Sequence, residues 1–359
     1  MRTNHVRAIS SMRRRAATAL FLGAAATGSA NLASSQTIAP EFAGCYSFVN
    51  LGTPLGVPAN LGGICFDPSD TNAILIGGAA NGGAGAVYRV PVTRNASGNI
   101  VAFAGPGVNA FSTPNIDGGL TFGPGGVLFF SQYSQNDVGQ IKPGSTGPDR
   151  IVDLDALGFT SSVGAFAFVP EGFPGEGRFK VAPYNSGIWH DATVTPDGAG
   201  TFDIVRNPAV AISIGGGPEG IVFVGAGNPN FSVPSALVSE YSGGRVVAYE
   251  LNANGDPIVS TRRVLMTGLS GAEGGARDPV TGDFLFSTFG GGNRVIVVNG
   301  FNLDCRANFN FDCAIDFFDY LDFVEAFAAD QPEGDFDGSG VVDFFDYLEF
   351  VQEFSDCGS

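Results

Sequence analysis

The chain has 359 residues, of which 18 are Lys or Arg and 35 are Asp or Glu, so its net charge is −17. This excess of acid argues against nucleic acid and anionic membranes as partners, because both require a positively charged surface. The 53 glycines and 21 prolines favour short strands and turns over long helices.

Residues 1–35 have the features of an export signal. Five arginines precede an apolar stretch, Ala16–Ala26, that is too short to span a bilayer. Small residues then fit a cleavage site at Gly28–Ala30 or Ala33–Ser35. An uncleaved anchor is the alternative, but it needs a longer apolar run. We therefore expect a protein that is secreted or held at a bacterial cell surface, with no transmembrane segment.

Residues 40–303 carry short alternating strands and no long amphipathic helix, which predicts an all-β domain. A loose motif recurs there, as in Gly118-Gly-Leu-Thr-Phe-Gly-Pro124, with starts 56, 46, 55 and 54 residues apart. A period near 50 with about four strands per unit is typical of a β-propeller blade. The five motifs begin at Gly62, Gly118, Gly164, Glu219 and Glu273.

We therefore expect a β-propeller of five blades, or six if the longer units hide another blade. The last unit contains only three strands, and Cys45–Leu51 is the segment that would add a fourth and close the ring. A β-sandwich is the alternative fold, but it does not explain the recurring position of the glycines.

The first residue of each motif is expected to line the central channel of the propeller. It is an acid in the last two motifs, Glu219 and Glu273, and Asp117 precedes the second motif. Three carboxylates around one axis either hold a metal ion or bond to backbone amides of neighbouring blades, and the second use is the commoner one. His190, the only histidine after the signal segment, is expected to be structural. The domain resembles NHL- and lactonase-type propellers in architecture alone, and this resemblance brings no catalytic residues with it.

Residues 304–359 contain one sequence unit twice, at an offset of 27 residues, and both copies include D-F-F-D-Y-L-x-F-V-x-x-F. Each copy begins with oxygen-bearing residues spaced as in a twelve-residue calcium loop. A solvated acidic surface is the alternative reading of so many carboxylates. The predicted ligands are Asn308, Asn310, Asp312, Ala314 (through its carbonyl), Asp316 and Asp319 in the first loop, and Asp335, Asp337, Ser339, Val341 (through its carbonyl), Asp343 and Asp346 in the second.

Each loop leads into a predicted helix, because apolar residues follow at i, i+3, i+4, i+7 and i+10. The second loop should bind its ion more tightly, since it has more carboxylates and has Gly340 at the sharp turn, where the first loop has Cys313. The predicted apolar stripes are Phe317, Tyr320, Leu321, Val324 and Phe327 in the first helix, and Phe344, Tyr347, Leu348, Val351 and Phe354 in the second.

Two adjacent phenylalanines begin each predicted helix. Phe317 and Phe344 belong to the apolar stripes, so we expect them to be buried between the two helices. Phe318 and Phe345 lie about 100° further round the helix. They either form an exposed pair of anchors for a partner or pack on the calcium loops.

The tandem loop–helix pattern resembles the type I dockerin over about the last 55 residues. The flanking cysteines and the final Cys-Gly resemble the variant that ends many secreted proteins of planctomycete-type bacteria. The resemblance implies a small α-helical module with two EF-hand-like loops, two calcium ions and a cohesin partner. Phenylalanine pairs stand where familiar dockerins have small hydroxyl residues, so the partner is expected to be cohesin-like or another surface receptor. The family's ligands fall on Asn308, Asn310, Asp312 and Asp319, and on Asp335, Asp337, Ser339 and Asp346.

The chain has five cysteines, which in an exported protein suggests disulfides with one cysteine left over. Cys305 and Cys357 bracket the tail and would clasp its ends. Cys45 and Cys65 would pair within the large domain, which leaves Cys313 unpaired.

Two classes of function are consistent with this organisation. In the first, which the sequence favours, the calcium-binding tail anchors a propeller that binds a carbohydrate or a protein, so the chain is not an enzyme. In the second, the propeller is a hydrolase or lactonase-type enzyme that the tail delivers to a polysaccharide-degrading complex. The channel separates them, because an enzyme needs a metal ion or an acid–base pair there.

Overall fold

The structure is a computed structural model that describes residues 35–301, 306–310, 312–313 and 315–357. The predicted export signal up to residue 34 lies outside this part of the chain, as do Cys305 and the predicted ligand Ala314. Neither tail helix is long and apolar enough to cross a membrane, and the described residues contain no other α-helix.

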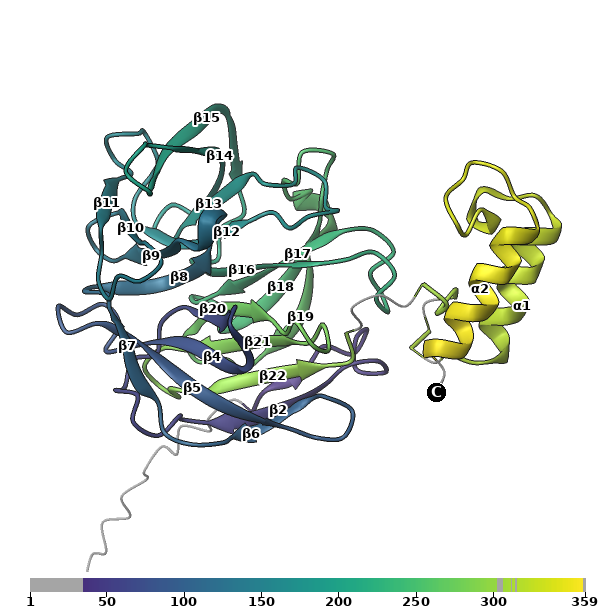
Figure 1. Cartoon of the computed structure of the whole chain (residues 1–359), viewed down its shortest axis with the longest axis horizontal. Coiled ribbons are helices and arrows are strands. Elements are labelled where there is room, and N and C mark those ends of the chain that lie inside the picture. The colour runs from purple at the N-terminus through teal and green to yellow at the C-terminus, as the bar shows by residue number, and fades with distance from the viewer. Residues whose placement is uncertain (1–34, 302–305, 311, 314, 358–359) are drawn as a thin grey trace, which may run out of the picture. The chain divides into compact units, whose positions relative to one another are not determined.

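Residues 47–299 form five antiparallel sheets arranged as blades around one axis (Figure 1). The innermost strands β3, β8, β12, β16 and β20 contact one another in this order, and β20 contacts β3, so the ring is closed. The predicted five-bladed propeller is confirmed, and the described residues form no sixth blade.

Blade 1 consists of β3 (Ile64–Asp67), β4 (Asp70–Gly78), β5 (Ala86–Arg94), β6 (Ile100–Phe103) and β7 (Val108–Ser112); blade 2 of β8 (Ile116–Phe122), β9 (Leu128–Gln132), β10 (Asp137–Ile141) and β11 (Arg150–Asp153). Blade 3 consists of β12 (Val163–Phe168), β13 (Phe179–Pro183), β14 (Ile188–Pro196) and β15 (Phe202–Ser213); blade 4 of β16 (Pro218–Val224), β17 (Ser235–Glu240), β18 (Arg245–Glu250) and β19 (Arg263–Thr267); blade 5 of β20 (Ala272–Arg277), β21 (Phe284–Thr288) and β22 (Val295–Asn299).

The N-terminal part of the domain completes two of the blades. Strand β2 (Ser47–Gly52) pairs antiparallel with β22 and supplies the fourth strand of blade 5, as the sequence predicted. Strand β1 (Thr37–Ile38) pairs with β19 and extends blade 4. Both pairings cover strand edges that would otherwise be open.

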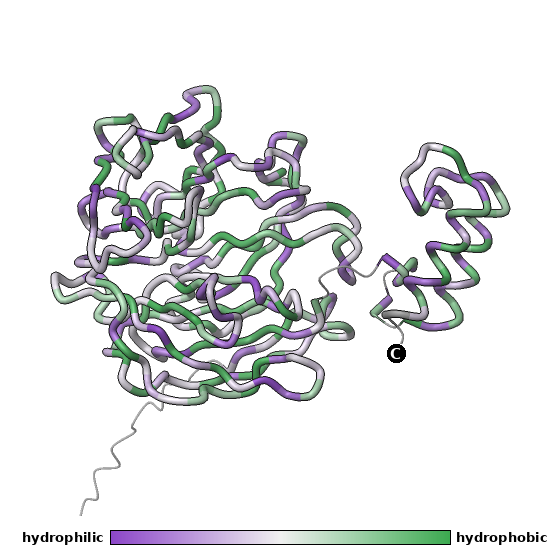
Figure 2. The backbone as a smooth tube through the Cα atoms, in the orientation of Figure 1, coloured by the Kyte–Doolittle hydropathy of each residue, from purple (hydrophilic) through white to green (hydrophobic). Residues whose placement is uncertain are grey.

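Neighbouring blades are held together by hydrophobic clusters, one at each of the five junctions. The backbone trace is hydrophobic mainly along the strands and hydrophilic in many loops (Figure 2). Just after the start of the inner strands, at the glycines of the motif, the ring leaves no room for side chains. A Cβ atom on Gly118 would lie 2.1 Å from the carbonyl oxygen of Glu219, and one on Gly274 would lie 2.6 Å from the Cα atom of Gly63. This close approach explains why glycine recurs in the sequence motif.

The tail contains two helices, α1 (Phe317–Ala328) and α2 (Phe344–Cys357), with the short turn η3 (Pro332–Gly334) between them. Phe323 and Phe350 are fully buried and stack with their ring centres 4.0 Å apart. The predicted burial of Phe317 and Phe344 was wrong, because their side chains are 64% and 63% exposed. The predicted apolar stripes were correct only in part. The core of each helix runs through the sixth residue after this phenylalanine, and Leu321 and Leu348 are exposed. The stripe residues that do pack against the core are Tyr320, Val324, Phe327, Tyr347 and Phe354. The next residue of the first helix, Phe318, is 62% exposed, as expected if it serves as an anchor for a partner.

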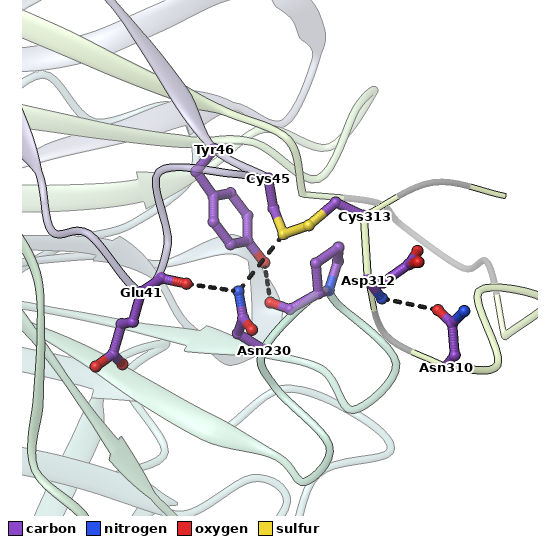
Figure 3. Close-up of a disulfide and its surroundings, with 8 residues drawn as sticks. Glu41, Cys45, Tyr46, Asn230, Asn310, Asp312 and Cys313 are labelled. Carbon is purple, nitrogen blue, oxygen red and sulfur yellow. Dashed lines mark hydrogen bonds between the residues drawn. A yellow bond between two sulfur atoms is a disulfide. The ribbon is translucent and has the colours of Figure 1, made fainter.

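One disulfide joins Cys45 to Cys313, 268 residues apart in sequence (Figure 3). Cys65 is a free, partly buried thiol. The predicted pair of Cys45 with Cys65 was therefore wrong, as was the expectation that Cys313 is unpaired. The sequence suggested this pairing because both cysteines lie in the propeller, but a closer partner in sequence need not be closer in space. The predicted Cys305–Cys357 bond involves a residue outside the described part of the chain.

Candidate metal centres

Three acidic side chains meet at the propeller axis. Asp117, Glu219 and Glu273 each occupy the second position of an inner strand, in blades 2, 4 and 5. They are 1%, 4% and 1% exposed, and one carboxylate oxygen of each lies within 4.8 Å of the others. We call these three residues the axial triad.

Local breaks in strand pairing accompany the axial triad. The register between the inner strand and its neighbour shifts just after the first residue in β8, β16 and β20, where the three acids lie. Such bulges leave a residue outside the regular ladder and turn its side chain away from the normal alternation. The sequence placed these three acids at the channel, and the bulges explain how their side chains turn toward one another there.

Burial of the triad favours the neutral form of each acid, because no basic side chain of the described residues balances a negative charge there. Burial raises the pKa of Asp117 to about 7, although bonds from Asn81 and from the Gly118 amide oppose the shift. Burial and the neighbouring carboxylates raise the pKa of Glu219 and of Glu273 well above the usual range. The carboxyl groups of Asp117 and Glu273 are neighbours, and Asp117 contributes to the raised pKa of Glu273.

The sequence also allowed these three acids to bond to backbone amides. The structure shows only part of this bonding. The Gly118 amide reaches Asp117 and Glu219. Both carboxylate oxygens of Glu273, Oε2 of Glu219 and Oδ2 of Asp117 are buried and find no donor among the described residues. An uncompensated buried carboxylate is costly, so this arrangement calls for a cation or for retained protons.

Two residues at the mouth of the axial triad were not singled out by the sequence. Asn81 follows β4, and its side chain bonds to Asp117. Tyr241 follows β17, and burial together with the charges of Glu273, Glu219 and Asp117 raises its pKa. The only sequence signal for Tyr241 is that aromatic residues follow the second strand in several units.

The described part of the propeller includes a polar and an apolar pocket of moderate size. One, of about 310 Å³, has a polar lining that includes Tyr184, Ser186 and Ser242 and adjoins the loop that enters β16. The other, of about 380 Å³, is lined by the inner strands and is largely apolar, with residues such as Phe66 and Phe166. The lining of the polar pocket includes Gly217, which precedes Glu219 by two residues, so the same segment of chain reaches the pocket and the axial triad.

His190 is buried on β14, and its Nε2 lies 3.0 Å from Oγ1 of Thr160, which in turn lies 2.6 Å from Oγ of Ser186. Burial and the charge of Arg206 lower the pKa of His190. Its Nδ1 has no carboxylate partner among the described residues, so the arrangement is not a Ser-His-Asp triad.

The second loop of the tail brings part of its predicted ligand set together. Oxygen atoms of Asp335, Asp337 and Asp346 lie within 4.8 Å of one another. Asp346 is fully buried and accepts hydrogen bonds from the amides of Asp337 (2.9 Å) and Asp343 (2.7 Å). Oδ1 of Asp335 is buried without a donor among the described residues.

The first loop repeats this framework with fewer carboxylates. Asp319 is buried and accepts from the amides of Asn310 (3.1 Å) and Asp316 (2.8 Å), as Asp346 does in the second loop. Oδ1 of Asn308 is buried and has no donor in the part of the tail that is described. Cys313 has φ = 82°, close to the 88° of Gly340, so it makes the same sharp turn.

Several predicted ligands have other roles in this structure. The carboxylates of Asp316 and Asp343 accept from the amides of Phe318 and Phe345, both at 2.8 Å. Asp316 thereby caps the start of α1. The Ser339 hydroxyl lies 3.2 Å from the carbonyl of Val341, and Asp312 is exposed.

No family model matches this sequence, and no curated protein matches it. Solved structures similar to the chain include the PQQ domain of pyranose dehydrogenase from Coprinopsis cinerea, at 12% identity and a TM-score of 0.41, covering 74% of this chain and 97% of that one. A protein of Bacteroides uniformis assigned as a 6-phosphogluconolactonase (13%, TM-score 0.38, 68% and 72% covered) and an auxiliary nutrient binding protein of Bacteroides ovatus (11%, TM-score 0.38, 71% and 77% covered) are also similar. With TM-scores below 0.5, none of these likenesses bears on activity, and the propeller is assigned from its own strand order.

Proposed function

We propose that the axial triad binds a divalent cation and that the propeller is a metal-dependent hydrolase acting on an ester or lactone. The observation that carries this proposal is the set of buried carboxylate oxygens without donors on Asp117, Glu219 and Glu273. Retaining such groups at an axis that otherwise admits only glycine is costly unless a ligand neutralises them.

The donor set indicates the kind of cation and the chemistry. Three carboxylates are the oxygen ligands that Ca²⁺, Mg²⁺ or Mn²⁺ prefers. A cation held there would polarise the carbonyl oxygen of a substrate. These properties favour the enzyme over the binding module that the sequence favoured.

Metal analysis of the purified full chain tests this proposal. Glu219→Gln with Glu273→Gln keeps the size of both side chains and removes two charges, so we expect it to lose one equivalent of cation and all hydrolysis of aryl esters and lactones. Asp335→Asn is the control for hydrolysis, because it changes a loop of the tail and leaves the axial triad intact. A full chain whose cation content is unchanged by the double substitution would refute the axial site.

A second function rests on the tail. We propose that the two loops bind two calcium ions, the second loop more tightly, and that the module anchors the exported propeller to a cohesin-like or other surface receptor. The acidic cluster of Asp335, Asp337 and Asp346 and the buried free oxygen of Asn308 support calcium binding. The matching bonds of Asp319 and Asp346 support a pair of similar loops.

Calcium titration of the full chain tests the tail. Binding should be biphasic, and Asp337→Asn should remove the tighter phase while the axial cation is retained. A titration that shows no calcium bound outside the axial triad would refute this second function.

A further inference from the structure

An aromatic residue recurs at one structural position in four of the five blades. It directly follows the second strand of the blade, and its amide donates to the carbonyl of the residue just before the inner strand. This shared bond fixes the start of each side chain at the same height along the axis. The four pairs are Tyr133 with Asn115 (3.0 Å), Tyr184 with Ser162 (2.6 Å), Tyr241 with Gly217 (2.9 Å) and Phe289 with Gly271 (2.8 Å).

This position lies at the mouth of the axial triad. In blades 2, 4 and 5 the accepting residue is two places before the acid, so Tyr133, Tyr241 and Phe289 each start close to one carboxylate. The rings of three consecutive blades touch: Tyr184 and Tyr241 are 5.6 Å apart at 89°, and Tyr241 and Phe289 are 6.2 Å apart at 60°. All three are only partly buried. We call Tyr184, Tyr241 and Phe289 the aromatic arc.

The aromatic arc and the triad together favour a positively charged ligand. Aromatic faces carry negative potential and attract compact organic cations, especially where several rings meet at steep angles. The axial triad adds to this attraction. Three ionised carboxylates that hold one divalent cation keep a net charge of minus one. If the aromatic side chains were parallel, they would instead have indicated a flat, uncharged ring as the ligand.

The polar pocket beside the arc has room for the rest of such a ligand. Its volume is about 310 Å³, and Tyr184 forms part of both the pocket and the arc. Asn185, Ser186 and Ser242 bring amide and hydroxyl groups to its wall. A ligand with its cationic end at the axis would therefore place an uncharged polar portion in this pocket.

We propose that the substrate of the axial site carries an alkylated or quaternary ammonium group, which the aromatic arc binds above the triad. This inference rests on the proposed function for its assignment of the triad as a cation site. It adds the class of substrate: an ester or lactone with a positively charged head and a small polar body.

Calorimetric titration of the full, calcium-loaded chain tests the inference with two probes of the same shape, choline and its neutral carbon analogue 3,3-dimethylbutan-1-ol. We expect choline to bind at least about 10-fold more tightly, since each ring contributes about 2- to 30-fold. Phe289→Leu keeps an apolar side chain and should weaken choline by a factor in that range, and Tyr241→Leu should do the same. Tyr241→Phe should retain most of the affinity. Phe103→Leu, on the outermost strand of blade 1, is the matched control and should change nothing.

The outcomes separate this inference from the proposed function. Equal affinity for the two probes, no measurable choline binding, or choline binding unchanged in both Phe289→Leu and Tyr241→Leu would overturn the ammonium inference, while metal analysis still scores the axial cation. A full chain without axial metal that still prefers choline would refute the hydrolase and retain the recognition of the ammonium group. If Tyr241→Leu does not fold, Phe289→Leu and Tyr241→Phe decide the question.

Discussion

In the absence of a cation, the propeller should lose stability as the pH rises. Burial raises the pKa of Asp117 from 3.8 to about 7, so between these values the folded state retains a proton that the unfolded state has released. Unfolding free energy therefore falls with increasing pH across this interval. A shift of about 3 pKa units corresponds to about 4 kcal/mol for Asp117 alone, and the raised pKa values of the two glutamates act in the same direction.

A cation reverses this dependence. When all three carboxylates are ionised and coordinated, no proton has to be retained, and the folded state gains the free energy of binding. At a free cation concentration 100 times the dissociation constant, this gain is about 2.7 kcal/mol. The difference between chelator and saturating cation should therefore be small at pH 5 and several kcal/mol at pH 8.

Trp189 provides the assay. It is the only tryptophan of the chain and is fully buried on β14, so its fluorescence reports on the propeller and not on the tail. Urea unfolding is followed at pH 5, 6, 7 and 8, in chelator and in calcium, for the full chain and for Asp117→Asn. The unfolding free energy of Asp117→Asn is subtracted from that of the full chain at each pH. This difference removes the contributions of His190 and of carboxylates elsewhere. If the difference in chelator does not fall between pH 5 and pH 8, the triad does not retain protons and the reasoning is wrong.

Three further predictions concern individual positions. Asp346→Ala should abolish calcium-induced helix formation in far-UV circular dichroism, because it removes two hydrogen bonds from loop amides to a carboxylate, worth about 1.5–3 kcal/mol each, whereas Asn308→Ala should only weaken it. Phe323→Ala should destabilise the tail by about 3–5 kcal/mol, measured by the thermal loss of its helical signal, and an unchanged midpoint would contradict the assignment of its core. Gly164→Ala should abolish axial cation binding in metal analysis and lower the urea midpoint, because the new Cβ atom would lie 2.4 Å from an axial carboxylate oxygen, whereas Gly44→Ala enters open space and should behave like the parent chain.

The large features of the fold could be predicted from the sequence because they follow from local patterns. The spacing of the glycine motifs gave the number of blades, and the shortage of one strand in the last unit identified β2 as the closing strand. The two repeated loops of the tail were equally accessible, because the residues that form each loop lie within twelve positions of one another. Such features need only short-range spacing, which a single sequence contains.

The remaining features depend on contacts between distant segments. The disulfide of Cys45 with Cys313 joins residues 268 positions apart, and no spacing rule relates them. The buried face of α1 passes through Phe323 and not through Phe317, because each helix of the tail packs against the other. The triad was suspected from its place before the glycines, but the lack of donors around Glu273 required the three-dimensional arrangement.

The narrowness of a five-bladed ring links these observations. Its inner strands lie so close that a Cβ atom on Gly220 would come within 2.5 Å of the carbonyl oxygen of Glu273, so no side chain reaches the axis at that level. Side chains reach the axis only just before this level, where the inner strands begin and the bulges lie. There the chain places three acids, and the loops above place aromatic rings. A site so narrow and so acidic selects for charge and compactness before it selects for shape, which is why we propose a metal ion, and above it a small ammonium group, as the ligands of this end of the propeller.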